Sequence, residues 1–337
     1  MRVLAVRQDN NGDVLLAGPA LRALAAGCER LSLLCGPSGR AAAETLPGVA
    51  DVLCAEAAWI EAEPQPVRRA SIERLVDTIA ARGFERAFVF TSFHQSPLPS
   101  ALVLRMAGVP WIAAISEDYA GSLLDLRVRD VPGDLHEVER ALALVRAAGY
   151  APPSGDDARL AMRTAARNPL GDAGAYVVVH PGATVPARAW EPRSNRELVE
   201  RLARRGERVV VTGSESERAL AHFVAGRHAR NLAGETDFPT LARVIADARA
   251  IVVGNTGAAH VAAAVGTPTV SIFPPTIPAV RFRPWMVEHA LLGEQDIACG
   301  GCRARLCPRG DHACVATLGV DAVIDALDSF ARVAVPA

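Results

Sequence analysis

The sequence predicts an α/β protein with two doubly wound domains, each a parallel sheet covered by helices. Short apolar runs rich in β-branched residues alternate with helical patterns along most of the chain. Half of the residues are hydrophobic but only 5% are aromatic, which is typical of a soluble α/β protein. With 337 residues the chain is long for one hydrophobic core.

The first domain is expected to cover residues 1–150. Its strands are short buried runs, expected at 2–7, 31–35, 49–54, 87–90 and 111–115. Its helices are expected at 13–26, 68–82, 98–107 and 135–148. Gly27 closes the first of these helices, and the last carries leucine, valine and alanine on one face. Such alternation implies a parallel sheet covered on both sides.

A linker is expected at 151–173, where proline, glycine, asparagine and aspartate dominate. The second domain, 174–319, is expected to have strands at 176–180, 208–212, 250–253 and 269–273. Its helices are expected at 195–205, 215–225, 239–248 and 258–265. A C-terminal helix within 320–337 is a candidate to cross back to the first domain. Two domains facing a cleft suit a ligand that bridges both, since ligands bind at the C-terminal ends of parallel strands.

Charge and hydropathy exclude several classes of function. The formal net charge of −1 gives no reason to expect nucleic acid as a partner. No apolar run reaches the ~18 residues of a spanning helix, and the N-terminus resembles a first strand rather than a signal peptide. We therefore expect a cytoplasmic protein, with peripheral contact at the inner face of the cytoplasmic membrane left open. The sequence contains no lysine, which excludes Schiff-base and P-loop lysine chemistry.

The segment 250–278 predicts a phosphate site. An apolar strand, 250–253, is followed by Gly254-Asn255-Thr256-Gly257 and then by a helix of small residues. A helix N-terminus presents unpaired N–H groups and the positive end of the dipole, which favour a phosphate or diphosphate. Alanines let this helix pack closely on its sheet. We expect a nucleotide diphosphate here.

The loop after the first strand contains Asn10, Asn11, Gly12 and Asp13. Gly12 permits a tight turn, and Asp13 stands where a helix begins. One interpretation makes Asp13 an N-cap, a position that aspartate favours. The other makes it a general base for an acceptor hydroxyl.

Two further loops follow strands of the second domain. In one, Thr184 can donate to a phosphate oxygen and Arg188 can neutralise it, although an ordinary surface loop gives the same pattern. In the other, Glu217 can accept from ribose hydroxyls, although acidic residues are also common in a first helical turn.

Four of the seven cysteines form a cluster, which consists of Cys299, Cys302, Cys307 and Cys314. In a cytoplasmic chain such a cluster favours a structural zinc or iron site over disulfides. The spacing is irregular for a zinc ribbon, so free thiols and disulfides remain alternatives.

Five short motifs occur in order along nearly the whole chain. They are Gly12-Asp13-Val14 with 19–24, His180 to Thr184 with Arg188 and Trp190, Gly213 with Glu217, Asn255 to His260, and Phe273 to Pro278. This order resembles the ADP-heptose:lipopolysaccharide heptosyltransferase family, glycosyltransferase family 9. The resemblance implies a GT-B fold of two Rossmann-like domains, with the acceptor on the first and the nucleotide sugar on the second.

The resemblance also implies roles for individual residues. Asp13 would be the catalytic base, with Asn10, Asn11 and Gly12 in the acceptor loop. Thr184 and Arg188 would hold the diphosphate and Glu217 the ribose, while Thr256, Gly257 and His260 would lie near the diphosphate and sugar. Without the resemblance, His260 is interpreted as a buried histidine satisfied by the backbone.

The chain departs from the family pattern at several positions. Asn255 stands where the family usually has aspartate, so an amide that both donates and accepts would meet the donor sugar. Arg188 replaces the usual lysine, and Asn10 and Asn11 replace the usual serines.

The predicted function is that of an inverting, metal-independent glycosyltransferase that moves heptose from ADP-heptose to an acceptor hydroxyl. The absence of an Asp-x-Asp triplet is the reason to expect no metal on the diphosphate. The acceptor is the lipopolysaccharide core or another glycan, glycolipid or small molecule. The alternatives are a nucleotide-sugar epimerase or hydrolase and a non-catalytic nucleotide-sugar binder.

Overall fold

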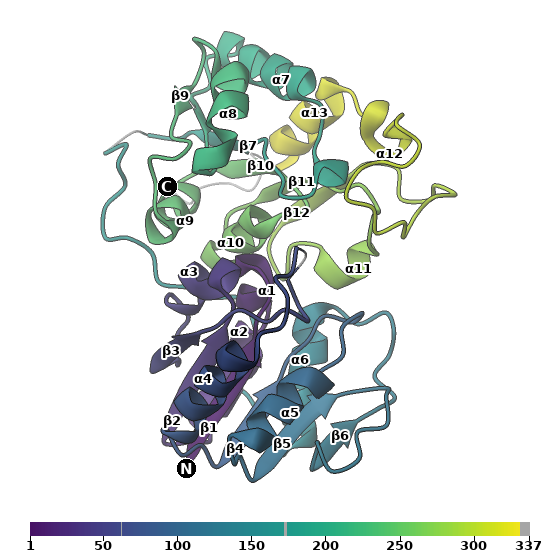
Figure 1. Cartoon of the computed structure of the whole chain (residues 1–337). Coiled ribbons are helices and arrows are strands. Elements are labelled where there is room, and N and C mark those ends of the chain that lie inside the picture. The colour runs from purple at the N-terminus through teal and green to yellow at the C-terminus, as the bar shows by residue number, and fades with distance from the viewer. Residues whose placement is uncertain (62, 172–173, 331–337) are drawn as a thin grey trace. The chain divides into compact units, whose positions relative to one another are not determined.

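The first unit, Met1–Met162, is built on a parallel sheet of six strands in the order β3-β2-β1-β4-β5-β6 (Figure 1). The structure is a computed structural model that describes residues 1–61, 63–171 and 174–330. The strands of this unit are β1 (Arg2–Arg7), β2 (Arg30–Cys35), β3 (Asp51–Cys54), β4 (Arg86–Val89), β5 (Trp111–Ile115) and β6 (Leu126–Val128). Five residues of β1 are buried, because this central strand has neighbours on both edges and helices on both faces.

Helices cover the two faces of the first sheet. α2 (Gly18–Ala26) packs against α6 (Glu137–Ala147) on one face, and α4 (Arg69–Ala80) packs against α5 (Leu98–Met106) on the other. Two short helices, α1 (Asn11–Leu16) and α3 (Arg40–Ala43), pack together near the ends of β1 and β2. The single helix expected at 13–26 is therefore two helices. The break at Ala17 precedes Gly18-Pro19, since proline lacks the N–H that a continuous helix needs.

The second unit, Arg163–Ala337, repeats this architecture with the strand order β12-β11-β10-β7-β8-β9. Its strands are β7 (Val177–His180), β8 (Val209–Val211), β9 (Arg230–Asn231), β10 (Ala250–Gly254), β11 (Thr269–Ile272) and β12 (His289–Leu292). α7 (Pro192–Arg204), α8 (Arg218–Ala225) and α13 (Val320–Phe330) contribute to one apolar core with this sheet. α9 (Phe238–Ala246) packs against α10 (Gly257–Val265). The remaining short elements are η1 (Pro37–Gly39), η2 (Pro186–Arg188), η3 (Glu215–Glu217), α11 (Ala279–Phe282) and α12 (Ala313–Ala316).

The boundary between the units falls between residues 162 and 163, inside the segment expected as a linker. The C-terminal helix α13 packs on β10, β11, β12 and α7, so its described part belongs to the second unit. Residues 331–337, the other part of the expected crossing helix, lie outside the described residues.

Both sheets have the strand order of a Rossmann fold, and each has its reversal of strand order beside the first strand of its series. In the first unit the reversal lies between β1 and β4, and in the second between β7 and β10. Ligands of open α/β sheets bind at the C-terminal ends of such strand pairs. The loops after these four strands are therefore where a site is expected.

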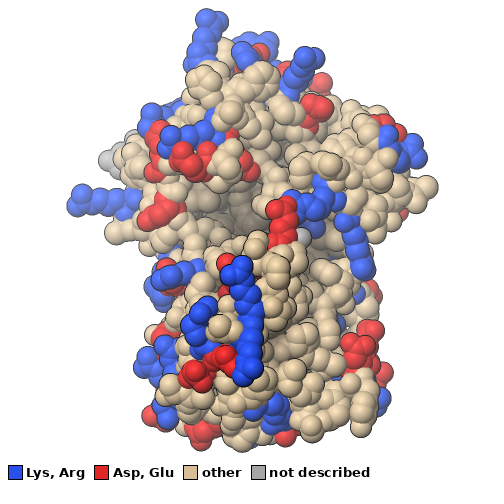
Figure 2. All heavy atoms as spheres, viewed as in Figure 1, with Lys and Arg blue, Asp and Glu red and all other residues tan. Residues whose placement is uncertain are grey.

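Charged side chains of both signs lie on the surface seen in Figure 2. On the face seen in Figure 2, acidic and basic side chains are interspersed over each unit. Within the described ranges, no helix is both long and apolar enough to cross a membrane.

Candidate active site

Asp13 lies in the first turn of α1, directly after β1. The N-cap of this helix is Asn10, which is extended and makes no side-chain cap. The interpretation of Asp13 as an N-cap is therefore wrong. Its Oδ1 accepts a hydrogen bond of 3.1 Å from Arg7 Nη2, and the side chain is 21% exposed. A carboxylate with partial access to solvent suits a general base.

Arg7, the last residue of β1, holds several groups together. Its side chain is only 5% exposed, and Nη2 also donates to Ser92 Oγ in the loop after β4, at 2.9 Å. Its Nε lies 3.0 Å from Asp9 Oδ2. Asp9 Oδ1 in turn accepts from Gln95 Nε2 at 2.6 Å. The loops after β1 and β4 are thus joined by one buried ionic cluster, which we call the Arg7 cluster: Arg7, Asp9, Asp13, Ser92 and Gln95.

Burial and charge act in opposite directions on the groups of this cluster. Burial alone would lower the pKa of Arg7, but the carboxylates of Asp9, Asp13 and Glu137 raise it overall. Burial raises the pKa of Asp9, and Arg7 offsets this effect only in part. Two carboxylates therefore share one guanidinium.

Close packing by two glycines fixes the backbone of the loop that carries Asp9. A Cβ at Gly36 would lie 2.6 Å from Gln8 O, and one at Gly39 would lie 2.6 Å from Asp9 O. Only glycine permits such an approach of two backbones. Asn11 Oδ1 accepts from Ala42 N at 2.9 Å, so this asparagine anchors α1 to α3. Asn10 is exposed and Gly12 is buried.

The N-terminus of α10 carries polar groups that the protein leaves unsatisfied. Thr256 is its N-cap residue but makes no side-chain cap, and its Oγ1 is buried without a hydrogen-bond partner. Asn255 Nδ2 and His260 Nδ1 are also buried without a partner. Gly257 begins the helix, so its N–H is among those that no helical carbonyl can satisfy. A buried polar group without a partner costs stability, which makes a ligand the simplest reason to retain three together.

His260 is neutral at physiological pH. Burial, and secondarily the positive charge of Arg188, lower the pKa of His260 to about 4. Its Nδ1 lacks a partner, so the interpretation of His260 as a histidine satisfied by the backbone is wrong. Because its charge acts on His260, the Arg188 guanidinium lies near α10. A Cβ at Gly254 would lie 3.0 Å from Arg188 O, so the end of β10 and η2 are in contact.

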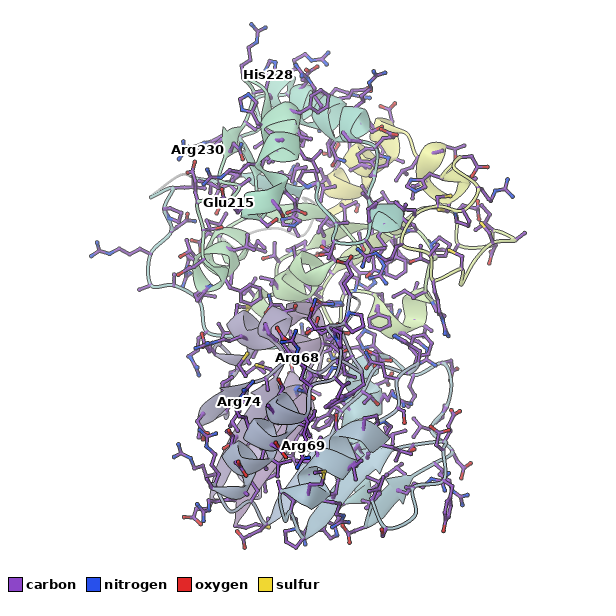
Figure 3. All side chains as sticks on the ribbon, in the orientation of Figure 1. Arg68, Arg69, Arg74, Glu215, His228 and Arg230 are labelled. Carbon is purple, nitrogen blue, oxygen red and sulfur yellow. The ribbon has the colours of Figure 1, made fainter. Side chains whose placement is uncertain are left out.

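The loop after β7 meets the loop after β8 at Glu217. Glu217 Oε2 accepts from Ser214 N at 2.7 Å and from Ser214 Oγ at 2.8 Å, which forms a capping box. Its Oε1 lies over Gly182. Burial lowers the pKa of His180 below its ordinary value, although Glu217 opposes this shift. Glu215, labelled in Figure 3, is instead exposed and pairs with Arg218.

Thr184, which was expected on the diphosphate, is exposed in the loop between β7 and η2. It belongs to the same loop as Gly182 and Arg188. The second-unit candidates therefore divide between the loop after β7 (Thr184, Arg188), the turn after β8 (Glu217) and the start of α10 (Asn255, Thr256, Gly257, His260).

The cysteine cluster lies beside these loops. Cys299, Cys302, Cys307 and Cys314 line one cavity of about 30 Å³ together with Ala187, Pro275 and Thr276. Backbone hydrogen bonds join the segment to the loop after β11 and to η2. Gly301 N donates to Pro275 O at 2.7 Å, Arg303 N to Thr276 O at 2.9 Å, and Ala187 N to Arg305 O at 2.9 Å.

The expected closed four-thiolate metal site is not seen. Across the described ranges, no three His, Cys, Asp or Glu side chains are arranged to hold a metal ion. All seven cysteines are free thiols, so the disulfide alternative is not seen either. Burial alone would raise the pKa of the Cys307 thiol. The N–H groups of His312, Arg309 and Gly310 direct hydrogen bonds at its sulfur and lower that pKa overall.

Some residues of the site were not predicted from the sequence. In the first unit Arg7 contacts Asp13, and Asp9, Ser92 and Gln95 join Arg7 in the same cluster; in the second, Thr276 contributes a buried Oγ1 without a partner near the cysteines. The available signal was charge at the end of a buried strand, since Arg7 and Asp9 directly follow the apolar core of β1.

Comparison with known proteins identifies the family. The model of the family described as glycosyltransferase family 9 (heptosyltransferase) matches residues 73–312. The chain belongs to glycosyltransferase family 9. It is thus a member of a family of glycosyltransferases. Lipopolysaccharide heptosyltransferase 1 of Pseudomonas aeruginosa is 35% identical over 228 residues, which cover 63% of this chain and 61% of that relative.

Solved structures share the fold over nearly the whole chain. The structure of Escherichia coli ADP-heptose lipopolysaccharide heptosyltransferase II matches with a TM-score of 0.74 and 21% identity, covering 98% of both chains. The E. coli heptosyltransferase WaaC, solved with ADP, matches with a TM-score of 0.72 and 20% identity over 98% of this chain and 100% of that one. The predicted GT-B fold class of two Rossmann-like units is confirmed.

Proposed function

We propose that this protein is an inverting glycosyltransferase that transfers a heptose from ADP-heptose to an acceptor hydroxyl. The observation that carries the proposal is the start of α10, where Asn255 Nδ2, Thr256 Oγ1 and His260 Nδ1 are buried without partners. Together with the N–H groups of the first helical turn, these atoms form a site for an anionic ligand. The family and the names of its relatives indicate that the ligand is the diphosphate of a nucleotide sugar.

The proposed donor site assigns one role to each loop of the second unit. Thr256 Oγ1 and the Gly257 N–H would donate to the diphosphate, and Arg188 would neutralise part of its charge. Thr184 is placed in the same loop as Arg188 and would donate to a phosphate oxygen. Glu217 would accept from a ribose hydroxyl through Oε1, since Ser214 already engages Oε2. Asn255 and neutral His260 would face the sugar.

The proposed reaction needs one base and a stabilised leaving group. Asp13 takes the proton of the acceptor hydroxyl while its oxygen attacks the anomeric carbon, and ADP leaves from the opposite face. The negative charge that develops on ADP is stabilised by the α10 dipole and by Arg188. We propose that no metal is needed at the diphosphate, because the sequence has no Asp-x-Asp triplet to hold one.

The proposed acceptor is the lipopolysaccharide core. The support is that curated relatives from P. aeruginosa and E. coli are named lipopolysaccharide heptosyltransferases. Such an acceptor is lipid-linked, so the proposed enzyme would work at a membrane surface. Another glycan, glycolipid or small-molecule hydroxyl would leave the chemistry unchanged.

A screen of donors and acceptors tests the function. The purified protein is incubated with ADP-heptose, other ADP-sugars or UDP-sugars, each with and without a lipopolysaccharide-core acceptor, and the products are identified by mass spectrometry. We expect a heptose-sized mass increase on the acceptor only with ADP-heptose. Rapid conversion of the donor without acceptor would instead indicate an epimerase or hydrolase, and tight donor binding without turnover would indicate a non-catalytic binder.

We further propose that the four clustered thiols bind a structural zinc or iron ion. Their donor chemistry fits such an ion, and they line one cavity. The side chains as placed do not converge on a common point, so binding requires them to rotate toward the cavity. The ion would serve folding rather than catalysis, by fixing the segment that contacts Pro275, Thr276 and Ala187.

A further inference from the structure

The Arg7 cluster contains more negative charge than folding requires. Arg7 is buried, and one carboxylate would suffice to compensate its charge. It nevertheless meets two aspartates, Asp9 at 3.0 Å and Asp13 at 3.1 Å. Asp9 is itself only 9% exposed, and burying a second carboxylate is costly. The unfavourable burial of this second carboxylate at the end of β1 indicates that Asp9 has a function.

The contacts of Asp9 form a ring that closes without Asp13. Gln95 Nε2 donates to Asp9 Oδ1 at 2.6 Å, and Ser92 N donates to Gln95 Oε1 at 2.9 Å. Ser92 Oγ accepts from Arg7 Nη2, and Arg7 Nε forms an ion pair with Asp9 Oδ2 at 3.0 Å, although neither of these two atoms makes a hydrogen bond within the described residues. The ring therefore fixes the guanidinium from two sides. Asp13 is attached to it through one oxygen.

This attachment leaves half of the Asp13 carboxylate available. Oδ1 accepts from Arg7, whereas Oδ2 has no hydrogen-bond partner in the part of the chain that the structure describes. An arginine that is free to rotate prefers to donate hydrogen bonds to both oxygens of a carboxylate. Here Asp9 and Ser92 hold Arg7 in an orientation that reaches only one.

We propose that Asp9 is a positioning residue for the base Asp13. Asp9 pairs with the Nε side of Arg7 and so prevents a bidentate pair between Arg7 and Asp13. Asp13 Oδ2 is thereby kept open for the acceptor hydroxyl. The inference rests on the function proposed above. It assigns Asp9, Gln95 and Ser92 to the support of the base, and Arg7 to its orientation.

Other charged groups face this cluster and set its background. Glu137, at the start of α6, acts on Arg7, and Arg140 of the same helix lines the small cavity beside Arg7. The charge of His94, in the loop after β4, acts on Asp9. The charge of Asp9 in turn acts on Glu61, in the loop after β3. Glu137 is thus a third carboxylate that acts on Arg7, and it is unchanged in the Asp9 variants.

The decisive variant is Asp9→Asn. The new amide keeps an acceptor for Gln95 but presents an N–H group or a neutral oxygen to Arg7 Nε, so Arg7 turns toward Asp13. We expect kcat to fall by about tenfold to a hundredfold, within the range that a general base contributes, while the KM for ADP-heptose changes by less than about twofold. The acid limb of the pH–rate profile should move to lower pH. The reason is that the full positive charge of Arg7 then favours the ionised form of Asp13, so its protonation needs a lower pH. Asp9→Glu, which restores the charge, should return the acid limb toward its original position.

Asp51→Asn is the matched control. Asp51 accepts from Arg30 Nε and from Ser32 Oγ, each at 2.9 Å, so it has the same kinds of partner in the same sheet. It lies at the first residue of β3, away from the loops after β1 and β4. This variant should keep kcat and the pH profile unchanged. A purely structural role for Asp9 predicts a lower melting temperature without a shifted acid limb.

A readout independent of turnover follows the Arg7 Nε–H directly. Its ¹⁵N resonance reports the ion pair with Asp9, so it should shift in Asp9→Asn and stay in place in Asp51→Asn. An unchanged resonance, or an unchanged kcat and acid limb in an active enzyme, would overturn the inference and leave the proposed function intact. A wild type that transfers no heptose would instead refute the proposed function, and the inference with it.

Discussion

Glu217 lies directly over Gly182. A Cβ built on Gly182 would come within 1.9 Å of Glu217 Oε1 and 2.2 Å of Glu217 Cδ, so the glycine makes room for this carboxylate. The two residues follow different strands, Gly182 after β7 and Glu217 after β8. Their contact therefore fixes the position of the Oε1 oxygen that we assign to the ribose.

The variant Gly182→Ala tests whether this position matters. The added methyl group meets the end of a flexible side chain, so Glu217 can rotate away at the cost of its capping box with Ser214, and the melting temperature should fall modestly. We expect the affinity for ADP, measured by calorimetry, to fall by about tenfold, the value of one good hydrogen bond to a charged group. Glu217→Ala should show the same loss, and the double variant should lose no more than either single variant. Additive losses would show that Gly182 acts on ADP independently of Glu217.

Thr256→Val should separate binding from stability. The hydroxyl of Thr256 is buried without a partner and caps no helix, so its removal should leave the free energy of unfolding unchanged or raise it. The affinity for ADP should fall by about tenfold, because a donor to the diphosphate is lost.

Thr267→Val is the control for this variant. Thr267 follows α10 and donates to Ile245 O at 2.7 Å while almost completely buried. Its loss should lower the free energy of unfolding by about 1–3 kcal/mol, because a buried carbonyl loses its partner, and leave the affinity for ADP unchanged. The assignment of Thr256 to the donor is wrong if Thr256→Val binds ADP as the wild type does.

Asp13→Asn should abolish turnover without weakening the donor. The amide keeps the shape of the carboxylate and an oxygen for Arg7 Nη2, but it cannot take the proton of the acceptor. We expect kcat to fall by about 10² to 10⁴, while the affinity for ADP stays within about twofold of the wild-type value. Near-normal turnover in a mass-spectrometric assay would remove Asp13 as the base.

Much of the fold follows from local sequence patterns. β1, β5, β10 and α5 lie within one residue of their expected bounds, because long apolar runs and clear helical periods define them. β6, β9 and β12 were not predicted. They are short edge strands, and strands exposed on one side lack the continuous apolar run of a buried strand. Edge pairing is decided by the neighbouring strand, which local sequence does not contain.

The candidate site was predicted less evenly. The start of α10 could be predicted because small residues and a hydroxyl at a strand-to-helix turn are a local signal. The Arg7 cluster could not, because Arg7 meets Ser92, and Asp9 meets Gln95, only after β1 pairs with β4, more than eighty positions along the chain. For His260, the sequence alone favoured a satisfied core histidine, whereas packing leaves its Nδ1 without a partner.

Replacing the clustered cysteines should weaken the binding of ADP, although none of them is assigned a contact with ADP. We expect Cys307→Ser together with Cys314→Ser to lower both the melting temperature and the affinity for ADP, since the segment supports Pro275, Thr276 and Ala187 through its backbone. Elemental analysis of the wild type should find about one zinc or iron ion per chain. Cys28→Ser, outside the cluster, should change neither property. A metal-free wild type that binds ADP fully would identify the four residues as free thiols.

Acid should destabilise the protein through His260. Burial and the charge of Arg188 lower the pKa of His260 to about 4, whereas the unfolded chain has the ordinary value of 6.5. Between these values the unfolded chain binds a proton that the folded protein does not. Stability from this group is therefore complete above pH 6.5 and is lost as the pH falls toward 4. The loss amounts to about 3 kcal/mol, since one pKa unit corresponds to about 1.4 kcal/mol.

The measurement is denaturant unfolding of the wild type and of His260→Gln between pH 7.5 and pH 4. A neutral side chain in place of the histidine removes the proton-linked term, so the variant should lose less stability over this range. The remaining slope includes His180, whose pKa burial also lowers and which stays in place in both proteins. His228 is partly buried in the turn after α8, and His228→Gln is the control for replacing a histidine away from α10. Parallel curves for the wild type and His260→Gln would show that folding does not lower the pKa of His260, which would contradict its assignment as a buried group beside Arg188.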